Sequence, residues 1–126
     1  MSSKKLITMV VEKTNTGYSA YAKEAAVFTV ASDLNELYEN TEEALSLALD
    51  REVLRDEFQL HIDLPQFFKY YRVLNAKFLA ERIGMNPTLL SQYVSGTKSP
   101  GPKQVHRILT GIHEIGKELS DLKFLV

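Results

Sequence analysis

Residues 76–95 read AKFLAERIGMNPTLLSQYVS, and this stretch decides the fold of the second half of the chain. Its apolar residues recur at helical spacing on both sides of Gly84, which can take the left-handed conformation that ends a helix. Asn86-Pro87 then offers a capping side chain followed by a proline, the favoured start of a new helix. The pattern predicts two short helices, 76–83 and 87–94, joined by a tight turn.

Two short helices that cross at a tight turn constrain the residue types along the segment. The residue at the crossing must be small, and here it is Ala80. The turn needs a residue that tolerates a positive φ, which Gly84 does. The positions that hold the pair on the domain core must be apolar, and they are Leu79, Ile83, Met85, Leu90 and Tyr93. This combination is typical of a DNA-binding helix-turn-helix, with an ordinary helical hairpin as the simpler alternative.

The segment resembles the helix-turn-helix of the Xre and phage-repressor type. Residues 79–86 are similar to that family's passage from the first helix into the turn, and residues 95–100 resemble the loop after its second helix. The resemblance implies that 87–94 is a recognition helix, which lies in the major groove of DNA. Ala76 stands where the family often has a phosphate-binding glutamine.

The resemblance also implies which side chains contact DNA. Gln92 can offer an acceptor–donor pair to adenine, and Thr88 and Ser91 can bond base edges. Pro87 occupies a position that often holds a polar base reader in that family. Basic side chains around the helix pair would neutralise phosphates, which position a protein on DNA without reading its sequence. The predicted DNA-binding residues are Asn86, Pro87, Thr88, Ser91, Gln92, Lys77, Lys98 and Lys103, with Arg107 as a further phosphate contact.

Charge is distributed unevenly along the chain, although the formal net charge is only −1. Residues 1–64 hold six basic and twelve acidic side chains, whereas residues 65–126 hold nine basic and four acidic ones. Between 65 and 107 there are seven basic residues and one acid, Glu81. An acidic half and a basic half suggest two surfaces for two partners, one of them nucleic acid. Chance clustering on solvated faces is the alternative.

Helical patterns extend on both sides of the central segment. Residues 66–74 form one candidate helix, and the last helix is expected from about Lys103 to Leu119 or beyond, with one apolar face. Gly111 and Gly116 weaken that last helix locally. The second half is therefore predicted to be all helical, beginning after Pro65.

The first half has a different pattern. Strand-like runs cover 4–14, 18–22 and 25–31, and Asn15-Thr16-Gly17 is a hairpin signal. Thr41 followed by two glutamates predicts a helix start, and that helix should run to about Asp56. Residues 58–64 alternate strictly and predict a fourth strand that ends at Pro65. The expected class is α+β: a small antiparallel sheet with one helix over 1–64, then the helical domain over 65–126.

The first half resembles the HicB antitoxin domain. Residues 10–13 and 17–21 are similar to that family's first hairpin, and residues 41–45 resemble its helix start, although the segment 33–40 is longer here. The resemblance implies a partial RNase H-like fold and a domain order known for such antitoxins. It also implies a HicA-like RNA-cleaving toxin as partner, neutralised by the acidic domain, and repression of the chain's own operon through operator DNA.

Several classes of protein are excluded by composition. The chain has no cysteine, so a disulfide framework, a thiolate nucleophile and a zinc finger are ruled out. No apolar run approaches the roughly 18 residues of a membrane span. The first residues lead into a strand without the features of a signal peptide. We therefore expect a cytoplasmic protein with no membrane contact and no cofactor.

Two alternatives to the antitoxin remain. The first is a stand-alone repressor whose N-terminal domain senses a ligand or oligomerises. The second is an RNase H-like nuclease, for which Asp33, Glu36, Glu42 and Glu43 offer carboxylates but no visible metal site. His106 and His113 lack a third ligand, so no metal site is expected. No constellation of acid, base and metal ligand is visible, so no enzymatic activity is expected. Because one recognition helix reads one half-site, a homodimer or a higher even oligomer is expected.

Overall fold

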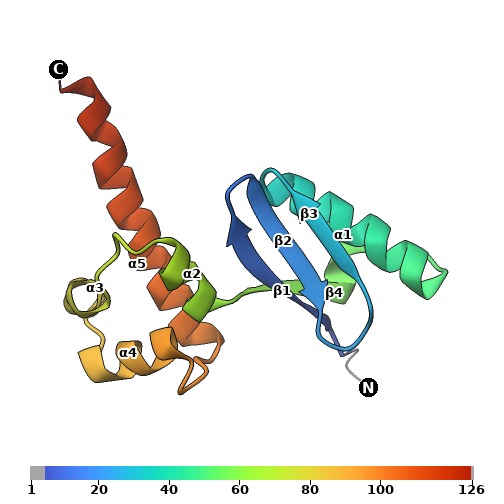
Figure 1. Cartoon of the computed structure of the whole chain (residues 1–126), viewed down its shortest axis with the longest axis horizontal. Helices are drawn as coiled ribbons and strands as arrows, with labels where there is room; N and C mark the ends of the chain where they lie inside the picture. The colour runs from blue at the N-terminus through green and yellow to red at the C-terminus, as the bar shows by residue number, and fades with distance from the viewer. Residues whose placement is uncertain (1–4, 126) are drawn as a thin grey trace. The chain divides into compact units, whose positions relative to one another are not determined.

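The computed structural model describes residues 5–125 and belongs to the α+β class (Figure 1). The chain separates into two compact units between Tyr70 and Tyr71. Among the described residues, the first unit contains a four-stranded sheet, two α-helices and the short 3₁₀ helix η1 (Arg55–Glu57), and the second contains three further α-helices. No helix in the described part of the chain is long and apolar enough to span a membrane.

The sheet of the first unit has the strand order β3-β2-β1-β4. Its strands are β1 (Ile7–Thr14), β2 (Gly17–Ala22), β3 (Phe28–Ala31) and β4 (Phe58–Ile62). The first three form the predicted antiparallel meander. The prediction of a wholly antiparallel sheet is wrong, because β4 pairs with β1 in parallel. A helical crossover separates β3 from β4, and such a connection is what brings two strands into a sheet in the same direction.

Helix α1 (Leu34–Leu49) is this crossover, and its bounds differ from the prediction. Asp33, not Thr41, caps its start: the Asp33 side chain accepts a hydrogen bond from the Glu36 N–H at 2.8 Å. Thr41 lies within the helix and is fully buried. The helix ends at Asp50, which has a φ of 52°, so it stops before the predicted end at Asp56. Residues 34–40, which belong to the longer segment expected before the helix start at Thr41, form the first part of the helix.

The core of the first unit lies between α1 and one face of the sheet. Strand residues that point to this face are small or apolar, and they pack under α1, as Figure 1 shows for the elements. Burial of this apolar surface is the main favourable contribution to folding of the unit. The core residues are Met9, Val11, Ala20, Ala22, Val27, Ala31, Leu37, Leu45, Val53 and Phe58.

Helix α2 (Leu64–Tyr70) belongs to the first unit. Leu64 and Phe68 are buried, and the Gln66 side chain bonds to the backbone of Lys13 in β1. The predicted helix 66–74 is therefore shorter and begins earlier, with Pro65 inside its first turn rather than at a strand end. Proline is accepted there because the first N–H groups of a helix need no intrahelical partner. The unit boundary consequently falls six residues after the one expected from Pro65.

The second unit is helical. It contains α3 (Ala76–Ile83), α4 (Pro87–Ser95) and α5 (Pro102–Ser120), and α5 continues into the short 3₁₀ helix η2 (Asp121–Phe124). Both α4 and α5 pack against α3. These bounds agree with the predicted helices 76–83 and 87–94 and with the long last helix. The buried residues of the unit are Leu79, Ala80, Met85, Leu90, Tyr93 and Ile108.

Candidate nucleic-acid interface

Helix α3 has a defined start and a defined end. The Asn75 side chain accepts a hydrogen bond from the Phe78 N–H at 3.1 Å, which satisfies one of the free donors of the first turn. Gly84 ends the helix with a φ of 70°, in the left-handed region. Glycine takes this conformation without strain, so the chain can turn at once towards α4.

Helix α4 starts after a turn that ends at Asn86. The Asn86 Oδ1 accepts hydrogen bonds from the N–H groups of Thr88, at 2.8 Å, and Leu89, at 3.2 Å. Pro87 follows at the first helical position, where it loses no hydrogen bond. Gly96 closes the helix with a φ of 83°. The Oδ1 atom of Asn86 therefore has a structural role as the helix cap. Only the side-chain Nδ2 of Asn86 remains for the predicted contact with DNA.

Most of the apolar residues predicted from the sequence spacing to hold α3 and α4 on the domain core are buried. Ala80, the small residue of the pair, is completely buried. Leu79, Met85, Leu90 and Tyr93 are also buried. Ile83 is only partly buried, and it meets α5 at Gly111, where an added Cβ would overlap the Ile83 side chain.

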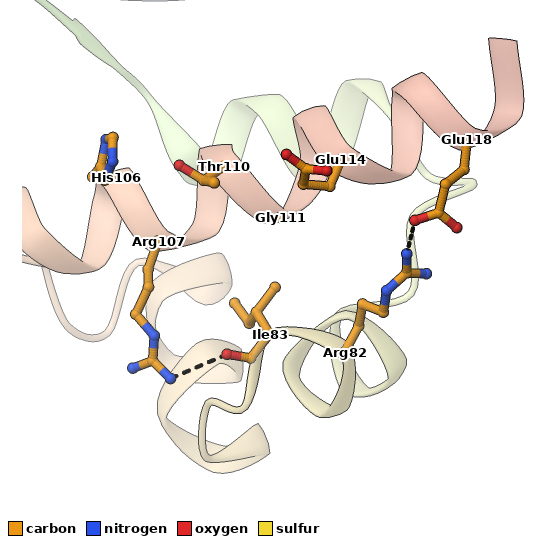
Figure 2. Close-up of a pocket in the computed structure, with 8 residues that line it drawn as sticks. All are labelled: Arg82, Ile83, His106, Arg107, Thr110, Gly111, Glu114 and Glu118. Carbon is orange, nitrogen blue, oxygen red and sulfur yellow. Dashed lines mark hydrogen bonds and ion pairs between the residues drawn. The ribbon is translucent and has the colours of Figure 1, made fainter.

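The Arg107 side chain of α5 forms hydrogen bonds to the turn between α3 and α4. Its Nη2 donates to the carbonyl of Gly84 at 2.7 Å and to that of Ile83 at 3.1 Å. These carbonyls lie at the C-terminus of α3, where they lack helical partners and favour a positive charge. Arg107 thus has a structural role at the turn, to which its guanidinium is directed (Figure 2), and its contact with phosphate stays a prediction.

The predicted base-reading residues lie on the face of α4 opposite the buried Leu90 and Tyr93. Thr88 and Ser91 are exposed, and Gln92 is half-buried. Their spacing of three and four residues places them on one side of the helix, since such residues are neighbours on a helical surface. Asn86 and Pro87 are exposed at the start of α4. A helix with one buried face and a short polar face of this kind can present hydroxyl and amide groups to the edges of bases.

The predicted phosphate-binding lysines are all exposed. Lys77 lies on α3 with its Nζ 5.9 Å from the centre of the Phe78 ring. Lys98 lies in the loop after α4, and its N–H donates to the Gln92 carbonyl at 3.1 Å, which ties the loop to the helix. Lys103 lies in the first turn of α5. Each ammonium group is free of an ion pair among the described residues, so it can neutralise an anion from outside.

A groove along α3 and α5, not predicted from the sequence, has a volume of about 470 Å³ (Figure 2). Its walls mix charges of both signs, and Arg82 and Glu118 form an ion pair across it. Gly111, expected from the sequence to weaken the helix, lines the middle of the groove (Figure 2), and its lack of a Cβ lets the Ile83 side chain approach α5. The lining residues are Arg82, Ile83, His106, Arg107, Thr110, Gly111, Glu114 and Glu118.

The first unit carries an acidic hollow of about 320 Å³ beside α1. Glu39, Glu42, Glu43 and Glu52 contribute to its lining. Arg55 bonds to Glu42 at 3.2 Å and its guanidinium lies 4.8 Å from the centre of the Tyr38 ring, so it offsets part of this charge. Mutual repulsion of the remaining carboxylates favours binding of a cationic group, because like charges close together destabilise each other.

The carboxylates considered for nuclease chemistry do not form a metal site in the described structure. Among residues 5–125, no group of three or more histidine and carboxylate side chains is arranged to hold a metal ion. Glu36 accepts a hydrogen bond from the Ser32 hydroxyl at 2.6 Å, and Asp33 caps α1. His106 lines the groove of α5, and His113 is exposed on the same helix.

Comparison with protein-family models, with curated proteins and with solved structures finds no match to this chain.

Proposed function

We propose that the chain is an antitoxin that represses its own operon, with α3 and α4 acting as a helix-turn-helix. The observation that carries the proposal is the two-sided character of α4. Leu90 and Tyr93 anchor one face in the core, while Thr88, Ser91 and Gln92 occupy the other. A recognition helix needs this division, because its buried face fixes the orientation in which its polar face meets base edges.

The positive charge around the helix pair supports DNA as the ligand. Within the second unit, six basic residues and one acid lie between 71 and 107, and Lys77, Lys98 and Lys103 are exposed. Phosphate neutralisation supplies much of the affinity of such proteins and makes it fall steeply with salt. We therefore expect specific binding of DNA that precedes the chain's own gene, with weaker, salt-sensitive binding of random DNA.

The DNA proposal is tested with the full chain and a fluorescent fragment of that upstream DNA. Gln92→Ala should weaken operator binding by about 1–3 kcal/mol and leave random DNA almost unaffected, because it removes a base contact. Lys98→Ala should weaken both, because phosphates are present in every sequence. Lys23→Ala, a change in the loop between β2 and β3, is the control and should alter neither. Unchanged operator binding in both α4-region variants would reject the recognition-helix assignment.

The partner proposed for the first unit is a small basic RNA-cleaving toxin of the HicA type. This part of the proposal is supported by the excess of acidic residues in the first half and by the glutamates that line the acidic hollow, three of which lie on α1. Opposite charge accelerates association and selects the partner more than it raises the final affinity. Glu43 is the clearest probe, since it is exposed and Glu42 is already paired with Arg55.

The toxin proposal is tested by co-expression with the small basic protein encoded beside the gene. The full chain should restore growth and copurify with that protein, and Glu43→Lys should slow complex formation more than Glu24→Lys, which reverses a charge in the loop between β2 and β3. Growth arrest that the full chain does not relieve, with no complex recovered, would reject the antitoxin. Retained operator binding in that case would leave a stand-alone repressor.

A further inference from the structure

Apolar residues along α5 and η2 repeat with the period of a coiled coil. Successive members are separated by three, four, three, four and three residues, and steps that alternate between three and four, as in a heptad repeat, keep a seam on one side of paired helices. These residues are Val105, Ile108, Ile112, Ile115, Leu119 and Leu122.

The two ends of this seam have different surroundings. Ile108 is fully buried in the second unit, and Ile112 and Ile115 are partly buried. Leu119 and Leu122 are 58% and 55% exposed, and α5 extends beyond α3 and α4 at this end (Figure 1). The seam therefore starts in a folded core, which holds the helix in place, and continues onto an apolar face that the second unit leaves uncovered.

We propose that this face pairs with the same face of a second copy, as a short parallel coiled coil. In heptad notation Ile112 and Leu119 take the a position, and Ile115 and Leu122 the d position. A seam of this kind is complementary to itself, as an interface with two-fold symmetry requires. The inference goes beyond the proposed function and does not depend on DNA or toxin binding.

The charges beside the seam specify the parallel orientation. Glu118 takes the g position and Lys123 the e position five residues later. In a parallel pair these positions face each other across the interface, so each glutamate meets a lysine of the second copy. An antiparallel pair would instead bring glutamate to glutamate and lysine to lysine. Glu118 also bonds to Arg82 through one carboxylate oxygen, and the other oxygen can accept the lysine.

The first test is the mass of the full chain in solution, by sedimentation equilibrium from low to high micromolar concentration without DNA. The expected mass is that of a dimer. Leu119→Ser with Leu122→Ser should give a monomer with unchanged helical circular dichroism, because both side chains are exposed in the single chain. Leu47→Ser with Leu49→Ser, a leucine pair on α1 that is 76% and 40% exposed, is the control and should stay dimeric. A monomeric wild type, or a dimeric Leu119/Leu122 variant, would overturn the proposal.

The second test measures orientation and uses the absence of cysteine from the chain. In a parallel pair, equivalent d positions meet, so two copies of Leu122→Cys should form a disulfide when diamide accepts their two electrons. Ser120→Cys, at a b position directed away from the seam, should remain reduced under the same conditions. A dimer by mass in which Leu122→Cys links no faster than Ser120→Cys would reject the parallel register. Operator binding by that dimer would leave the proposed function intact.

Discussion

The Gln66 side chain bonds to both backbone groups of Lys13. Its Oε1 accepts from the Lys13 N–H at 2.9 Å, and its Nε2 donates to the Lys13 carbonyl at 2.8 Å. Strand β4 pairs with β1 only as far as Val11, where Ile62 is the partner. The amide of Gln66 thus takes the place of a further β4 residue and continues the ladder along β1. Buried or partly buried backbone groups need such partners.

Gln66→Ala should lower the free energy of unfolding of the first unit by about 1–3 kcal/mol, because it leaves the Lys13 N–H and carbonyl without this partner. The measurement is urea denaturation of the full chain followed by circular dichroism. Gln59→Ala is the matched control, since Gln59 bonds to the Thr8 hydroxyl and to no backbone group among its described contacts. Equal losses in the two variants would contradict the role given to the Gln66 amide.

The position of α2 predicts where the chain can be divided. A fragment of residues 1–70 should be monodisperse and unfold cooperatively, whereas a fragment of residues 1–64 should be less stable. The shorter fragment lacks Gln66 and the buried Phe68, and removal of a buried phenylalanine alone costs about 3–5 kcal/mol. Thermal unfolding of the two fragments gives the comparison. Identical midpoints would show that α2 adds nothing to the first unit.

Thr41 and Asp33 give opposite predictions for the start of α1. The Thr41 hydroxyl is buried and has no hydrogen-bond partner among the described residues, so Thr41→Val should stabilise the fold by about 1 kcal/mol. Asp33→Ala should destabilise it by about 0.5–2 kcal/mol, because Asp33 is the cap. Chemical denaturation measures both. A loss of stability in Thr41→Val would support the cap expected from the sequence.

Gly111 and Gly116 lie on the same helix and predict opposite responses to alanine. An added Cβ at Gly111 would overlap the Ile83 side chain, so Gly111→Ala should destabilise the second unit by about 1–3 kcal/mol. Outside the adjoining helix backbone, no described residue lies within 4 Å of an added Cβ at Gly116, so Gly116→Ala should stabilise α5 by about 0.5–1 kcal/mol. Chemical denaturation of each variant, followed by circular dichroism at a helical wavelength, measures the two changes in unfolding free energy. A stabilising Gly111→Ala would contradict the contact between α3 and α5, and a destabilising Gly116→Ala would contradict the open space at Gly116.

Arg107 distinguishes a structural contact from a phosphate contact. Arg107→Met should lower the stability of the second unit by about 1 kcal/mol, through loss of the bonds to the turn carbonyls. The salt dependence of DNA binding should stay unchanged, whereas Lys98→Ala should reduce its log–log slope by about 0.9. Binding titrations at several salt concentrations provide the measurement. A reduced slope for Arg107→Met would show that this arginine also contacts phosphate.

The sequence by itself determined the features that depend on local rules. Asn75, Gly84, Asn86-Pro87 and Gly96 set the bounds of α3 and α4, because capping and positive φ are properties of a few neighbouring residues. The antiparallel meander followed in the same way from its turn at Asn15-Thr16-Gly17. The apolar spacing along residues 76–95 likewise identified most of the side chains that the second unit buries.

Tertiary structure decided what depends on contacts between distant segments. Whether Thr41 caps a helix or lies inside one depends on how α1 packs on the sheet, and local preference is too weak to settle it. The parallel pairing of β4 depends on which edge of the sheet the crossover reaches. Gln66 and Arg107 have polar side chains that suit solvent equally well, and only the fold brings unpaired backbone groups within their reach. The backbone partners of Gln66 and Arg107 lie far away in the sequence, so no local sequence pattern could predict these bonds.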